Sequence, residues 1–210
     1  KVDKATNGKV GYIYIPDMGP EGLNEFSRYF YPQLDKEGLI IDDRANGGGN
    51  VSPMILERLS REPYRLTMRR GSSLIGTVPD AVQVGPKVCL INKYSASDGD
   101  LFPWGFRALG LGKLIGTRTW GGIIGISGPL PYMDGTDIRV PFFTSYDPKT
   151  GNWIIENHGV DPDILIDNDP IKEWNGEDQQ LDRAIEEVMK QLKERKPLAP
   201  VPAPRDWSHK

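Results

Sequence analysis

Short apolar runs, each followed by a polar loop and a helical pattern, constrain the fold of this chain more than any other feature. Residues 38–42 and 87–92 are such runs, and neither has the alternation of apolar and polar side chains expected of a half-exposed strand. Continuous apolar strands are typical of parallel sheets that are covered on both faces. The repeated order of strand and helix predicts an α/β fold with a mixed, partly parallel sheet and flanking helices.

Further strands and helices are indicated on either side of these units. Residues 9–15 alternate as a strand does, and residues 113–115 form a third short strand. Residues 179–195 carry one apolar stripe at helical spacing and give the clearest helix. Residues 123–166 are rich in strand and turn signals, whereas residues 62–86 have no clear period and are expected to form a loop.

Length and charge limit the number of domains and the kinds of partner. A chain of 210 residues suits one large domain, and we expect a core over residues 1–195 and a proline-rich tail over residues 196–210. The 26 basic and 29 acidic residues give a net charge of −3 without a lysine or arginine run, which argues against nucleic acid or an anionic membrane as partner. No apolar stretch approaches the roughly 18 residues that a membrane span requires.

The small numbers of cysteine and histidine residues argue against disulfide bonds and metal sites. Cys89 is the only cysteine, so neither an internal disulfide nor a cysteine zinc cluster can form. His158 and His209 are the only histidines, which disfavours a metal site built from protein ligands alone. We therefore expect no metal and no cofactor.

A serine lies where the second apolar run gives way to a helix. Ser97 and Asp98 follow the strand predicted at residues 87–92 and precede the next helical pattern. Ligands bind at the carboxyl ends of parallel strands, where helix N–H groups also point outward. Ser97 at such a position can be a nucleophile, with the next amide holding an oxyanion. The alternative is that Ser97 or Asp98 simply caps the helix, a common use of both residue types.

A glycine loop follows the first apolar run in the same way. Gly47, Gly48 and Gly49 lie after the strand predicted at residues 38–42 and before a helical pattern. Glycine allows backbone amides to approach a ligand closely. The loop lacks the residues that accompany phosphate-binding motifs. Two interpretations of the glycines are left, namely an oxyanion hole and a plain tight turn.

A late acidic segment contains the first of the two histidines. Glu156 could orient a general base or act as a plain ion-pair partner, and a lone histidine such as His158 is more often a hydrogen-bonded structural residue. On a strand, Glu156 and His158 would share a face. Gly159 and Pro162 indicate instead that the chain turns here, which disfavours His158 as a base.

Five motifs in this order resemble a known family. They are Gly-Tyr-Ile-Tyr-Ile-Pro-Asp-Met (11–18), Leu-Ile-Ile-Asp-Asp-Arg-Ala-Asn-Gly-Gly-Gly (39–49), Ser-Asp-Gly-Asp (97–100), Gly-Lys-Leu-Ile-Gly-Thr-Arg-Thr-Trp-Gly-Gly (112–122) and Glu-Asn-His-Gly-Val-Asp-Pro-Asp (156–163). Residues 8–195 are similar to the catalytic core of the tricorn family, within the tail-specific (C-terminal-processing) serine peptidases. The resemblance implies a Clp/crotonase-like fold with a β-β-α spiral.

The resemblance also implies roles for individual residues. Ser97 matches the nucleophile, and the amides of Asp98 and Gly49, with Gly48 as the alternative to Gly49, match the oxyanion hole. Glu156 matches the carboxylate that supports the base through an intervening serine. The histidine base of this branch lies upstream, and Lys113, the first lysine after Ser97, lies within a strand motif and is a poor substitute.

The resemblance implies partners as well. We expect peptide substrates, upstream helical and PDZ domains in the same protein, a homo-oligomer and a cytoplasmic location, with a periplasmic one left open. Because the base is missing, the chain alone is expected to be inactive. Two alternatives are a non-catalytic peptide-binding or assembly domain that retains the fold and, more weakly supported, an acyl-coenzyme A enzyme of the related crotonase fold.

Overall fold

A five-stranded parallel sheet forms the centre of the molecule. The computed structural model describes residues 1–72, 74–126, 128 and 130–203. Every pairing in the central sheet is parallel, whereas the other strands pair as antiparallel two-stranded ribbons. The expected α/β class and partly parallel arrangement are therefore confirmed. The central strands, in their order across the sheet, are β1 (Val10–Tyr14), β2 (Gly38–Asp42), β5 (Lys87–Ile91), β6 (Gly112–Gly116) and β11 (Ile164–Leu165).

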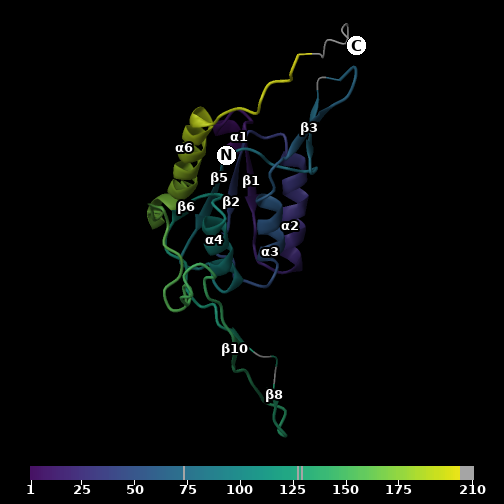
Figure 1. The fold of residues 1–210 in the computed structure, drawn as a ribbon. Coiled ribbons are helices and arrows are strands. Elements are labelled where there is room, and N and C mark those ends of the chain that lie inside the picture. The colour runs from purple at the N-terminus through teal and green to yellow at the C-terminus, as the bar shows by residue number, and fades with distance from the viewer. Residues whose placement is uncertain (73, 127, 129, 204–210) are drawn as a thin grey trace, which may run out of the picture.

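Helices cover both faces of this sheet, as Figure 1 shows. Alternate side chains of each strand point to opposite faces, so Leu39 and Ile41 of β2 pack on one side while Ile40 packs on the other. The burial of both faces explains why these strands read as continuous apolar runs. One face carries α2 (Pro20–Phe30), α3 (Ser52–Leu59) and α4 (Asp98–Ala108), and the other carries α1 (Val2–Ala5) and α6 (Gln179–Glu194).

The sheet order brings two loops together. Because β2 and β5 are parallel neighbours, with Asp42 opposite Leu90, their carboxyl ends lie side by side. The loop that follows β2 contains the three glycines, and the loop that follows β5 contains Ser97. The topology alone therefore places the glycine loop beside the serine.

Two ribbons extend from this body. Residues 62–86, expected to be a loop, contain an antiparallel hairpin of β3 (Arg65–Met68) and β4 (Ile75–Val78), and this expectation was wrong. Four of the strands found within residues 123–166 lie in a long arm that projects away from the sheet (Figure 1), whereas β11 belongs to the central sheet. The strands of the arm are β7 (Gly125–Ile126), β8 (Leu130–Pro131), β9 (Asp137–Ile138) and β10 (Pro141–Phe143).

The remaining elements are short. They are the 3₁₀-helix η1 (Tyr31–Gln33) and the helix α5 (Pro170–Trp174). Residues 195–203 contain neither helix nor strand, and the rest of the expected tail, with His209, lies outside the described residues. None of the helices in the described ranges is long and apolar enough to cross a membrane.

Candidate active site

Ser97 lies at a strained turn between β5 and α4. It occupies the N-cap position of α4 with φ 57° and ψ −120°, and its side chain makes no capping hydrogen bond. The alternative in which Ser97 serves as a helix cap is therefore wrong. A residue other than glycine at positive φ is costly, and such strain often marks functional sites. Because the side chain is exposed, the hydroxyl is open to a ligand at the amino end of the helix.

Asp98 caps a helix, but not its own. Its buried carboxylate accepts hydrogen bonds from the hydroxyl and, at 3.0 Å, the backbone N–H of Ser52, the first residue of α3. A carboxylate at this position satisfies N–H groups that α3 cannot pair internally and complements the positive end of that helix. Asp98 thus ties the serine turn to the segment that follows the glycine loop.

The glycine loop packs directly against the serine turn. A Cβ on Gly48 would lie 2.6 Å from the Ser97 Cβ, so only glycine allows this approach. The Gly48 N–H donates to Asn46 Oδ1 at 2.9 Å and is already used. Met18 pairs with the loop through its N–H to Gly48 O (2.9 Å) and its carbonyl to Asn50 N (2.7 Å), which turns the intervening Gly49 N–H away from Met18.

Two backbone donors are therefore open beside Ser97. In the part of the chain that the structure describes, neither the N–H of Gly49 nor that of Asp98 has a hydrogen-bond acceptor. The Asp98 N–H is open because it lies in the first turn of α4. Paired N–H groups next to a nucleophile are the usual construction of an oxyanion hole. The geometry favours Gly49 over Gly48 as the donor from the loop.

Glu156 is held in a turn by backbone groups. Its Oε2 accepts hydrogen bonds from Ile123 N (2.7 Å) and Ile124 N (2.9 Å), and the side chain is half-buried. No cation pairs with Glu156 among the described residues, so the ion-pair alternative is not realised. The loop that receives Glu156 is joined to the serine turn by a hydrogen bond from Trp120 N to Ser95 O of 2.9 Å.

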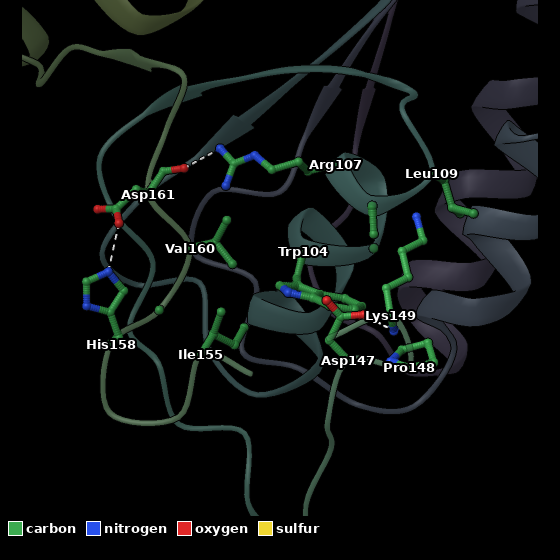
Figure 2. Close-up of a pocket in the computed structure, with 13 residues that line it drawn as sticks. Trp104, Arg107, Leu109, Asp147, Pro148, Lys149, Ile155, His158, Val160 and Asp161 are labelled. Atoms are coloured by element: carbon green, nitrogen blue, oxygen red, sulfur yellow. Dashed lines mark hydrogen bonds and ion pairs between the residues drawn. The ribbon is translucent and has the colours of Figure 1, made fainter. Parts of the chain in front are cut away.

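His158 is engaged elsewhere. Its Nε2 lies 2.7 Å from Asp161 Oδ2, and the ring points toward that carboxylate in Figure 2. Hydrogen bonds from His158 and from Arg118 lower the pKa of Asp161. Residues 155–158 form a turn rather than a strand, so Glu156 and His158 do not share a strand face. These contacts fit the expectation of a structural histidine.

A large cavity lies apart from these residues. It has a volume of about 720 Å³ and is bounded by the second half of α4 and the loops around residues 147–149 and 155–161, as Figure 2 shows. Trp104, Ile155 and Val160 supply apolar walls. Ser97, Gly49, Asp98 and Glu156 are absent from its lining. The cavity is therefore not the candidate active site.

A buried acid beneath the site was missed by the sequence analysis. Asp43 directly follows β2 and is fully buried, and neither of its carboxyl oxygens has a hydrogen-bond partner within the described residues. Burial, followed by the nearby carboxylates of Asp42, Asp100 and Asp98, raises its pKa well above the ordinary value. Burial therefore favours the neutral form of this carboxyl group over the charged form. No local sequence pattern distinguishes Asp43 from a surface acid of the same loop.

Replacing Asp43 by asparagine should stabilise the protein at neutral pH. When folding raises the pKa of a carboxyl group, the stability that this group contributes is fully present at a pH below its pKa in the unfolded chain, ~4. This stability is lost as the pH rises toward the pKa of the group in the folded protein. Asparagine does not titrate and removes this loss, so the gain in the free energy of unfolding should be larger at pH 8 than at pH 4. Urea unfolding at several pH values would measure it. The account fails if the gain is the same at pH 4 and pH 8.

Comparisons with known proteins define the class of this chain. Residues 9–166 match the model of Peptidase family S41, and the chain belongs to this peptidase family. It is 44% identical to the tricorn protease of Thermoplasma volcanium over 93% of this chain and 19% of that protein. It is 37% identical to tricorn protease homolog 1 of Streptomyces coelicolor over 92% of this chain and 18% of that protein.

A solved structure agrees with this assignment. The crystal structure of the tricorn protease superposes with a TM-score of 0.85 at 42% identity, over 91% of this chain and 19% of that one. The expected fold and the expected family, the tricorn group within Peptidase family S41, are thereby confirmed. The chain spans about a fifth of the length of these relatives, so they contain large regions that it does not cover.

Proposed function

We propose that this chain is the catalytic core of a serine peptidase that hydrolyses peptide bonds in peptides or unfolded chains. Ser97 is the nucleophile, the N–H groups of Gly49 and Asp98 form the oxyanion hole, and Glu156 supports the base. The observation that carries the proposal is the strained, exposed Ser97 packed against a glycine loop, with two open N–H donors beside it. Membership of Peptidase family S41 supports the same reaction class.

The proposed reaction follows from these positions. The Ser97 hydroxyl oxygen attacks the carbonyl carbon of the scissile bond while a base takes its proton. The carbonyl oxygen becomes an oxyanion that accepts hydrogen bonds from Gly49 and Asp98. The C–N bond then breaks, the leaving amine takes the proton, and water hydrolyses the acyl-enzyme by the same steps in reverse.

The base is proposed to come from another segment of the full-length protein. His158 is paired with Asp161, and the Nζ of Lys113 lies 2.7 Å from the Glu187 carboxylate on α6. Neither is therefore placed as a proton acceptor for Ser97. We place the base in an upstream helical region followed by a PDZ domain. A homo-oligomer in the cytoplasm, with residues 196–210 as an extended tail, completes the proposal.

The isolated chain is expected to have negligible peptidase activity, because a serine hydroxyl needs a neighbouring group to take its proton. The full-length protein should cleave fluorogenic peptides under the same conditions. Both should be assayed at equal concentration, with circular dichroism to show that the isolated chain is folded. Robust hydrolysis by the isolated chain that is abolished by His158→Ala would contradict the assignment of the base.

A second candidate function is a peptide-binding or assembly domain that no longer catalyses. It is favoured by one observation, namely that neither His158 nor Lys113 is free to act as the base. Hydrolysis by the full-length protein separates the two functions. If the full-length protein binds peptides but does not cleave them, the non-catalytic alternative holds.

A further inference from the structure

We infer that Asp100 is a positioning residue that fixes Glu156 relative to Ser97. This inference rests on the proposed function, because it assigns a role within the same site. Asp100 lies on α4, three residues after Ser97, and its side chain is completely buried. Among the described residues no hydrogen bond joins its side chain to the Ser97 hydroxyl, so we assign its effect on catalysis to the groups that it holds.

Asp100 holds two segments together. Its carboxylate accepts hydrogen bonds from Gly121 N at 2.7 Å and Gly122 N at 3.3 Å, which belong to the loop after β6. Burial raises the pKa of Asp100, and the nearby Thr119 side chain and Ser97 N–H act to lower it. The backbone N–H of Asp100 donates to Ser97 O at 2.9 Å, so this one residue joins the serine turn, through its backbone, to the loop, through its carboxylate.

The same loop determines where Glu156 lies. The two N–H groups that bind Glu156 belong to Ile123 and Ile124, immediately after the glycines that bind Asp100. Asn157 N also donates to Gly121 O at 2.7 Å, so the turn of Glu156 is fixed to this loop on both sides. Two connections therefore join the serine turn to the loop that holds Glu156, namely the Asp100 carboxylate and the hydrogen bond from Trp120 N to Ser95 O, and the Asp100 connection lies nearer to the two N–H groups that bind Glu156.

The loop after β6 and the turn after Glu156 approach each other closely, which leaves little room for either to move alone. Gly121 has φ +91°, and a Cβ at this position would lie 2.4 Å from Gly159 N, so the loop passes directly over the turn after Glu156. If Asp100 releases the loop, Glu156 must move with it. An asparagine at position 100 keeps the size of the side chain but turns one acceptor into a donor that faces a backbone N–H. One of the two glycine contacts is then lost.

The test is a double-mutant cycle in the full-length protein, with kcat and KM measured on one fluorogenic peptide. Glu156→Gln should lower kcat by about 10- to 100-fold, as expected for a residue that orients a base. Asp100→Asn should lower kcat to a similar extent, with KM changed by no more than about 3-fold. If Asp100 acts through Glu156, the double variant should be no more than about 3-fold slower than the slower single variant.

Asp163→Asn is the matched control. Its carboxylate also accepts a backbone N–H, from Leu114 at 2.7 Å, and pairs with Arg107, but it lies away from the loop that holds Glu156. This variant should retain kcat. If Asp100→Asn does not fold, Gly121→Ala replaces it in the cycle, because it strains the same loop while leaving the carboxylate intact.

Three outcomes are decisive. Losses that multiply in the double variant would overturn the inference, because they would show that Asp100 and Glu156 act independently. Retention of kcat by Asp100→Asn would overturn it as well. Ser97→Ala, assayed in parallel, distinguishes failure of the proposed function from failure of this inference. If the Ser97→Ala variant is still active, the proposed active site as a whole is wrong, and not only the role of Asp100.

Discussion

Replacing Ser97 by alanine in the full-length protein should lower kcat by about 10³-fold or more and leave the fold intact. The loss is large because the substitution removes the atom that attacks the peptide bond. The fold should be retained because the Ser97 side chain makes no capping hydrogen bond and is exposed. Within the described residues the Ser97 hydroxyl makes no hydrogen bond that would hold the strained turn. Steady-state kinetics together with thermal unfolding would measure both effects.

Ser95→Ala provides the matched control two residues earlier. Its hydroxyl is buried and donates to Asp43 O at 2.8 Å, so this variant should lose about 1 kcal/mol of stability while keeping kcat within a few-fold. We therefore expect Ser97→Ala to lower kcat without a loss of stability, and Ser95→Ala to lower stability with little change in kcat. If Ser95→Ala abolishes turnover in folded protein and Ser97→Ala does not, the nucleophile has been assigned to the wrong serine.

Replacing Gly49 by valine should lower kcat by about 10²-fold or more and change peptide binding much less. Gly49 has φ +150°, and a Cβ there would lie 2.0 Å from the Met18 carbonyl oxygen. Since that contact is with backbone, the loop itself must shift, and the Gly49 N–H moves from its place beside Ser97. Loss of one oxyanion donor has a cost of this size. The kcat and the dissociation constant of a non-cleaved peptide would be compared.

Gly47→Val controls for the volume added to the same loop. No atom lies within 4 Å of a Cβ built on Gly47, and its φ is outside the left-handed region. This variant should keep both turnover and binding. Equal losses in turnover and binding for Gly49→Val would mean that the loop shapes the substrate groove and supplies no donor to the oxyanion.

Features that depend on neighbours in the sequence were predicted well. The apolar runs at residues 38–42 and 87–92 predicted buried strands because burial on both faces needs apolar side chains at every position. The family resemblance implied that the glycine loop and Ser97 form one site, and in the structure each follows one of these strands. The helix stripe at residues 179–195 corresponds to α6, whose apolar face covers the sheet.

Features that depend on distant contacts were not predicted. Asp98 was expected to cap its own helix or none, but its partner is Ser52, 46 residues earlier in the chain. The Asp100 contact with Gly121 likewise joins segments 21 residues apart. The N–H and O–H groups that donate to a buried carboxylate are determined by the packing of the whole domain, which leaves no local pattern. Residues 62–86 were missed because a hairpin that is exposed on both faces lacks apolar alternation.

The most direct test of the account is covalent labelling of the full-length protein with a fluorophosphonate, followed by proteolysis and mass spectrometry. Such a probe reacts with a serine that a base activates and an oxyanion hole supports. The account predicts a single modified residue, Ser97, and loss of this label in Gly49→Val. Modification of Ser95 or another serine, or no labelling of a protein that still hydrolyses peptides, would contradict it.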